Sequence, residues 1–96
     1  MNTKEMYKLA WRFWRCKLYE QDCWDSMNED EQEDYEGIDS PATWNYYQAC
    51  MLSSEAKADY IRAGVPDRVM MKARRAICQR ELLQFSGCGI KRINSF

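Results

Sequence analysis

The chain has 96 residues, of which 46% are hydrophobic and 14% aromatic, with four glycines and two prolines. This length allows one small domain, and the composition excludes a disordered chain, a collagen-like repeat and a flexible linker. The longest uninterrupted apolar run is Ala49–Leu52, and the first residues lack the apolar core of a signal peptide. We therefore expect a soluble, cytoplasmic protein without a membrane segment.

Several missing patterns argue against catalysis. The chain contains no histidine, which is the commonest general base and metal ligand. Its five cysteines are odd in number and form no C-x-x-C pair, which indicates reduced thiols rather than disulfides or a zinc site. The glycines are dispersed, and no EF-hand loop is present. We expect no enzymatic activity, no cofactor and no metal.

Charge is divided unevenly along the chain, although the net charge is only −1. Residues 1–19 carry five bases and one acid, and residues 20–39 carry ten acids and no base. Residues 55–96 carry nine bases and four acids. The chain is therefore basic, then acidic, then basic.

The first predicted helix runs from about Thr3, taken as its N-cap, to about Cys23. Its apolar residues cover more than half of the circumference, and Lys4, Lys8, Arg12 and Arg15 share the remaining face. One apolar stripe consists of Tyr7, Trp11, Trp14 and Leu18. Such a wide apolar arc indicates either a central helix or an aromatic surface that binds another molecule.

The acidic stretch at about residues 25–39 is expected to form an extended loop or a short helix frayed by repulsion. Ser40 and Pro41 predict the start of a second helix, which carries Trp44, Tyr47, Ala49, Cys50 and Leu52. The polar run that begins at Ser53 predicts a third helix, which ends before Gly64.

The last predicted helix is basic and runs from about residue 65 to about Phe85, followed by a short basic tail at residues 88–96. Its core face consists of Val69, Met70, Ala73, Ala76 and Ile77. No strand is predicted. The expected fold is therefore an all-α single domain, residues 1–96, built as a small bundle of about four helices.

The acidic tract has three interpretations. In the first, it is a solvated loop that keeps an aromatic protein soluble. In the second, it pairs within the fold with the basic stripes, which are the basic faces of the first and last helices. In the third, it is a phosphate-mimicking surface that competes with nucleic acid for the binding channel of another protein. The last interpretation makes the acidic residues a partner-binding surface, which consists of Glu29, Asp30, Glu31, Glu33, Asp34 and Glu36.

Direct nucleic-acid binding is the alternative function. Residues 58–69 resemble a helix-turn-helix in outline, but Tyr60 replaces the usual small residue and Pro66 shortens the turn, which favours a plain helical hairpin. The small acidic excess opposes the approach of phosphate. The candidate nucleic-acid-binding residues are Arg68, Lys72, Arg74 and Arg75.

The chain has four tryptophans, six tyrosines and six methionines, which is the side-chain chemistry of binding hot spots. In size and composition it resembles the small bacteriophage proteins that disable or redirect a host nucleic-acid machine, such as anti-CRISPR proteins and modulators of the RecBCD recombination nuclease. The resemblance implies a non-catalytic inhibitor of a host protein complex that handles nucleic acid, acting in the host cytoplasm. A homodimer is also compatible with the apolar stripes. The expected anchors on the first helix are Tyr7, Trp11, Arg12, Trp14 and Arg15.

Overall fold

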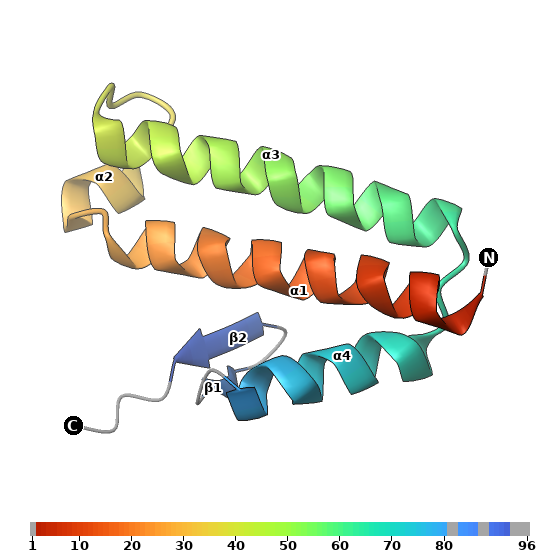
Figure 1. The fold of residues 1–96 in the computed structure, drawn as a ribbon. Coiled ribbons are helices and arrows are strands. Elements are labelled where there is room, and N and C mark those ends of the chain that lie inside the picture. Colours follow the sequence, from red (N-terminus) through yellow and green to blue (C-terminus); the bar gives the residue numbers. More distant parts are fainter. Residues whose placement is uncertain (1, 81–82, 87–88, 93–96) are drawn as a thin grey trace.

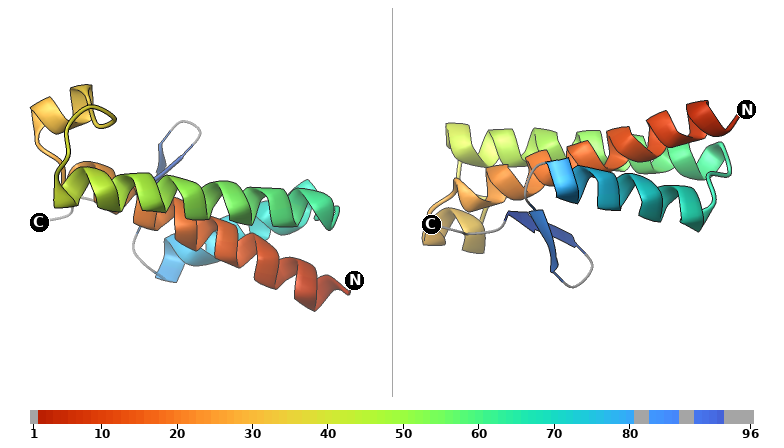
Figure 2. Two further views of the ribbon diagram at one scale, coloured as in Figure 1. Left: turned by 90° about the horizontal axis from the view of Figure 1, so that it is seen from above. Right: turned by 60° about the horizontal axis from the view of Figure 1, so that its bottom comes forward.

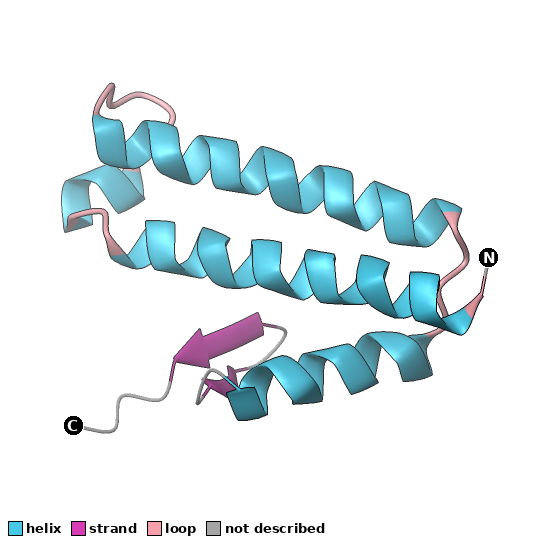
Figure 3. Cartoon of the chain, in the orientation of Figure 1, coloured by secondary structure: helices cyan, strands magenta, loops and turns pink. Residues whose placement is uncertain are grey.

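The computed structural model describes residues 2–80, 83–86 and 89–92 and shows an all-α bundle followed by a small β-hairpin (Figure 3). The predicted fold class is confirmed. The helices are α1 (Thr3–Asp25), α2 (Glu29–Glu33), α3 (Pro41–Arg62) and α4 (Asp67–Arg80). The hairpin pairs β1 (Leu83–Ser86) with β2 (Gly89–Arg92) in antiparallel register, with Leu83 opposite Arg92.

Helix α1 is the central element of the bundle. It lies between α3 and α4, and each of these two helices packs mainly on α1 (Figure 1). The buried residues of α1 are Ala10, Phe13, Trp14, Leu18 and Cys23. Because α1 has a neighbouring helix on two sides, it needs a wide apolar arc. Of the two interpretations of this arc, the central helix is therefore the correct one.

Helix α4 packs with the apolar face that its sequence predicts. Val69, Met70, Ala73 and Ile77 are buried, and Ile77 has no exposed surface. They join Phe13, Trp14 and Leu18 of α1 in one core cluster. Burial of this cluster is the main favourable contribution to the stability of the domain.

Helix α3 is continuous, where the sequence predicted two helices. Ser53 was interpreted as a start signal, but it is buried in the middle of α3, and no glycine or proline follows Pro41 until Gly64. The buried residues of α3 are all small: Thr43, Ala49, Ser53 and Ala56. Small side chains let α3 approach α1 closely at these positions, and the half-buried rings of Tyr46 and Tyr60 also contact α1, with their centres 5.1 Å from Trp24 and 5.0 Å from Phe13.

The helix starts follow local capping chemistry. Ser40 caps α3 with Pro41 in the first turn, as predicted. At α1 the predicted N-cap Thr3 is wrong by one residue, because the Oδ1 atom of Asn2 accepts the Glu5 N–H at 2.8 Å.

Among the described residues, no helix combines the length and apolarity needed to cross a lipid bilayer.

The C-terminal part differs from the prediction. Helix α4 ends at Arg80 rather than near Phe85, and residues 83–86 form β1. Ser86 and Gly89 face each other in the hairpin, where glycine-rich sequence favours chain reversal over helix. Of the predicted tail at 88–96, residues 89–92 form β2, while Cys88 and residues 93–96 lie outside the described residues.

Gly64 ends α3 in a left-handed conformation. Its φ is +70°, and the Val65 N–H donates to the Tyr60 carbonyl at 3.1 Å. An added Cβ would meet no atom within 4 Å, so a substitution changes only the backbone energy. We expect Gly64→Ala to lower the free energy of unfolding by about 1 kcal/mol and Gly64→Asn by less, because asparagine tolerates this conformation. Urea unfolding followed by circular dichroism tests the order; an alanine variant as stable as the parent would contradict it.

Candidate functional site

The aromatic residues predicted as anchors on α1 face α4 instead of solvent. Trp14 is only 8% exposed, and its Nε1–H donates to the Met70 carbonyl at 2.9 Å. The guanidinium carbon of Arg74 lies 5.2 Å from the centre of the Trp14 ring. Trp14 is therefore a core residue, and its prediction as a partner anchor is wrong because α4 covers it.

Tyr7 and Trp11 are half-buried in the same α1–α4 seam. The Lys72 Nζ lies 5.8 Å from the Tyr7 ring centre, and the Arg80 guanidinium carbon lies 6.0 Å from the Trp11 ring centre. These are cation–π distances. Cations of α4 thus cover the aromatic stripe of α1, so Tyr7 and Trp11 do not offer an open aromatic surface.

The predicted basic residues are placed differently from one another. Arg12 is exposed, and its Nη1 lies 2.7 Å from Oδ2 of Asp59 on α3, so it forms an ion pair within the fold. Arg15 is exposed. On α4 the side chains of Arg68, Lys72 and Arg75 are exposed, whereas Arg74 is half-buried against Trp14.

The acidic segment is folded rather than frayed. It forms α2 and a loop at the end of the bundle opposite the α3–α4 connection (Figures 1 and 2). Three aromatic rings anchor it: Tyr35 of the loop lies 6.3 Å from Trp24 of α1 and 5.0 Å from Tyr46 of α3, centre to centre. The Gln32 Nε2–H also donates to the Trp24 carbonyl at 2.9 Å. The segment therefore combines the two predicted forms, a short helix at residues 29–33 and a loop that leads to α3.

Glu31 joins the caps of two helices. Its carboxylate accepts the Asn28 N–H at 2.9 Å, which completes a capping box at α2. The second carboxylate oxygen accepts the Ser40 hydroxyl, the N-cap of α3. These contacts give Glu31 a structural role. The predicted partner-binding surface is therefore formed by the other acidic residues of the tract and not by Glu31.

The bond from Ser40, followed by that from Asn28, holds the pKa of Glu31 below its ordinary value of 4.5. A lowered pKa in the folded state means that this contribution to stability is present above the ordinary value and is lost as the pH falls through the lowered one. We expect Ser40→Ala to raise the Glu31 pKa and Ser54→Ala, an exposed position on α3, to leave it unchanged. Carboxyl-carbon NMR titration measures both, and equal Glu31 titration in Ser40→Ala and the parent would contradict the assignment.

The other predicted carboxylates, Glu29, Asp30, Glu33, Asp34 and Glu36, are exposed. Within the described part of the chain, no lysine or arginine side chain lies within ion-pair distance of a carboxylate of residues 29–39. The interpretation of this tract as an internal partner of the basic stripes is therefore wrong for these residues.

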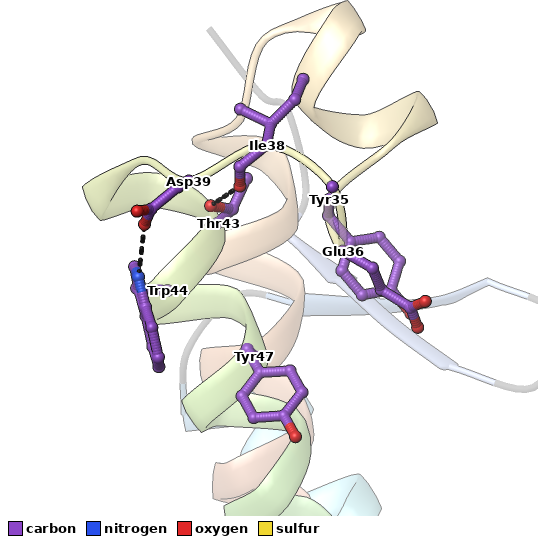
Figure 4. A pocket seen from close by; sticks show the side chains of 8 residues that line it. Tyr35, Glu36, Ile38, Asp39, Thr43, Trp44 and Tyr47 are labelled. Atoms are coloured by element: carbon purple, nitrogen blue, oxygen red, sulfur yellow. Dashed lines mark hydrogen bonds between the residues drawn. The ribbon is translucent and has the colours of Figure 1, made fainter.

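A hollow of about 520 Å³ lies between the acidic loop and the first turns of α3 (Figure 4). Its apolar lining comes from Tyr35 and Ile38 of the loop and from Trp44 and Tyr47 of α3. Glu36 and Asp39 contribute carboxylates. The hollow combines aromatic rings with negative charge, and we call it the acidic–aromatic hollow.

Hydrogen bonds from α3 fix the loop beside the hollow. The Thr43 hydroxyl donates to the Ile38 carbonyl at 2.7 Å. The Trp44 Nε1–H donates to Oδ1 of Asp39 at 2.7 Å (Figure 4). The Trp44 and Tyr47 rings stand edge to face with their centres 6.3 Å apart. Both rings are thus held at the hollow by neighbours on the same helix or loop.

The apolar lining continues along the outer face of α3. Trp44, Tyr47 and Met51 are 56%, 51% and 52% exposed, and we call these three residues the outer row. Their spacing places them on one helix face, opposite the small buried residues that contact α1. The sequence pattern places Trp44 and Tyr47 on one predicted helix with Ala49 and Cys50 and does not predict this division. The signal is present in the spacing, because Ala49, Ser53 and Ala56 share one face of α3 and the outer row shares another.

The described cysteines are free thiols, and three of them have little reactivity. Burial is the main factor that raises the pKa of Cys16, Cys50 and Cys78. Such thiols stay protonated at neutral pH, and the protonated form is a poor nucleophile. Across the described residues, no three cysteine, aspartate or glutamate side chains gather as metal ligands.

Comparison of the chain with protein-family models, with curated proteins and with solved structures finds no match in any of the three.

Proposed function

We propose that this chain is a small non-catalytic protein that binds, in the cytoplasm, a host protein complex that processes nucleic acid. The proposed binding face consists of the acidic–aromatic hollow, the exposed carboxylates of residues 29–39 and the outer row. The observation that carries the proposal is the position of two half-exposed aromatic side chains, Trp44 and Tyr47, directly beside carboxylates that have no described basic partner.

The chemistry of this face suits a basic protein surface. Residues 29–39 carry seven acids and no base, a concentrated negative charge that resembles a short stretch of nucleic acid in sign. Enzymes that hold nucleic acid present lysine and arginine along their channels. Charge complementarity speeds association and selects the partner, whereas buried aromatic and methionine side chains supply most of the affinity.

The proposed mechanism is occupation without chemistry. When the acidic end is bound on a basic channel, it excludes the nucleic acid that would otherwise lie there and so inhibits or redirects the complex. The proposal follows from the resemblance in size and composition to small bacteriophage proteins that disable or redirect a host nucleic-acid machine. The outer row then packs on apolar surface next to the channel.

Nucleic-acid binding by α4 is the second candidate. Arg68, Lys72 and Arg75 recur at helical spacing and are exposed, which is a pattern that can contact phosphates. Arg74 is not part of this set, because it packs on Trp14. Lys72 also lies over the Tyr7 ring, which ties part of the basic face to the fold.

Affinity capture separates the two candidates. The tagged protein is used to recover partners from nuclease-treated bacterial lysate, followed by mass spectrometry. We expect a stoichiometric nucleic-acid-processing complex that is retained by a Lys72→Glu/Arg75→Glu variant and lost by a Trp44→Ala/Tyr47→Ala variant. Recovery of nucleic acid alone, or loss of capture only in the α4 variant, would overturn the proposal in favour of the second candidate. Thermal unfolding of both variants establishes that they remain folded.

A further inference from the structure

We infer that the acidic–aromatic hollow binds the guanidinium group of an arginine on the partner. This inference rests on the proposed function and specifies its contact chemistry. The hollow brings together the ring faces that attract cations and the carboxylates that neutralise them, and both are held in place by the loop geometry described above.

The aromatic walls provide a stacking surface. Trp44 and Tyr47 come from α3, while Tyr35 lies across the hollow on the loop (Figure 4). Trp44 and Tyr47 are more than half exposed. An indole has the strongest attraction for a cation among aromatic side chains. The same molecule already uses this contact internally, with Arg74 over Trp14 and Arg80 over Trp11.

The carboxylates complete the site. Asp39 uses Oδ1 to hold the Trp44 indole, and among the described residues its Oδ2 has no hydrogen-bond partner. Glu36 lies on the same loop at the edge of the hollow. A guanidinium can therefore lie on an aromatic face while it donates to Asp39, and no described lysine or arginine competes for the position.

Arginine fits this arrangement better than lysine. A guanidinium is planar, stacks on aromatic rings and donates in a fork that matches a carboxylate. It is also less strongly hydrated than an ammonium group, so it loses less on entering a half-apolar hollow. Proteins that bind nucleic acid use arginine side chains to contact phosphates, so the proposed partner class presents the group that the hollow would bind.

A peptide titration followed by NMR tests the inference on the whole chain. The probes are short capped glycine peptides that carry one arginine, one lysine or one citrulline, which has the shape of arginine without its charge. We expect saturable movement of the Trp44 indole N–H signal with the arginine peptide, roughly tenfold weaker binding of the lysine peptide and none of the citrulline peptide. Equal binding of arginine and citrulline, or binding that leaves the Trp44 signal unmoved, would overturn the inference.

Matched variants locate the contact. Asp39→Asn retains the acceptor for the Trp44 indole but removes the charge, and Tyr47→Ala removes one ring. Each is expected to weaken arginine binding several-fold, whereas Tyr19→Ala, an exposed tyrosine away from the hollow, is expected to leave it unchanged. Unchanged binding in both hollow variants would overturn the assignment.

The result is separable from the proposed function. If the arginine peptide fails to bind while partner capture still depends on Trp44 and Tyr47, the arginine contact is wrong and the proposed function stands. If the peptide binds but capture does not depend on these residues, the proposed function is wrong.

Discussion

Replacement of Trp14 by alanine is expected to lower the free energy of unfolding by roughly 3–5 kcal/mol, the largest effect of any single substitution considered in this protein. The indole is buried between α1 and α4, and its N–H donates to the Met70 carbonyl. It also stands edge to face with the Phe13 ring, with the two ring centres 4.9 Å apart. Alanine leaves a cavity and removes the hydrogen bond together with the surface on which Arg74 packs. The free energy of unfolding of native domains is roughly 5–15 kcal/mol, so the variant is expected to be only marginally stable.

Urea unfolding of two further variants separates the loss of the buried ring from the loss of its hydrogen bond, and the core position from a surface position. Trp14→Phe keeps a ring but lacks the N–H donor, so we expect a loss intermediate between alanine and the parent. Trp44→Ala removes an exposed tryptophan and is expected to change the stability by no more than about 0.5 kcal/mol. A similar loss for Trp14→Ala and Trp44→Ala would contradict the assignment of one indole to the core and the other to the surface.

The second large effect concerns binding. Trp44→Ala is expected to weaken the affinity for the captured partner by at least about 30-fold, equivalent to roughly 2 kcal/mol, because a central tryptophan buried on association is a typical hot spot. Trp44 is suited to this role since Asp39 already fixes its ring, which reduces the entropy lost on binding. Surface plasmon resonance with the purified partner measures the effect, and we expect most of it in the dissociation rate.

Ile61→Ala is the matched control for this affinity measurement. Ile61 is 59% exposed on the same helix but does not line the hollow, so its truncation should change the affinity less than threefold, or about 0.6 kcal/mol. Losses of similar size for Trp44→Ala and Ile61→Ala would show that the apolar surface of α3 acts without a defined anchor, contrary to the proposed binding face.

Much of the fold could be predicted from local sequence signals. Ser40 with Pro41 marks the start of α3, Gly64 marks its end, and the apolar spacing in α4 gives its core face. These features depend on hydrogen bonds and backbone conformations within a few residues. The same signals mislead at Ser53, where a serine that could cap a helix is instead buried in the middle of α3. Tertiary packing decided that position.

The candidate site was less predictable, because the sequence does not show which helix has neighbours on two sides. Trp14 and Trp44 are both tryptophans on amphipathic helices, yet α4 covers Trp14 and no described element covers the outer face of α3. The charge pattern predicts the acidic residues as a binding surface but does not predict what lies beside them. Their position beside Trp44 and Tyr47 depends on the aromatic contact of Tyr35 with Trp24 and Tyr46, which joins residues far apart in the chain.

The most direct test of the proposed binding face is hydroxyl-radical footprinting of the protein alone and in complex with its captured partner. Tryptophan, tyrosine and methionine are readily oxidised, and four exposed examples lie on different faces: Trp44, Tyr47 and Met51 in the outer row, and Met71 on α4. We expect oxidation of the outer row to fall in the complex and oxidation of Met71 to remain unchanged. Protection of Met71 with continued oxidation of Trp44, Tyr47 and Met51 would contradict the proposed binding face.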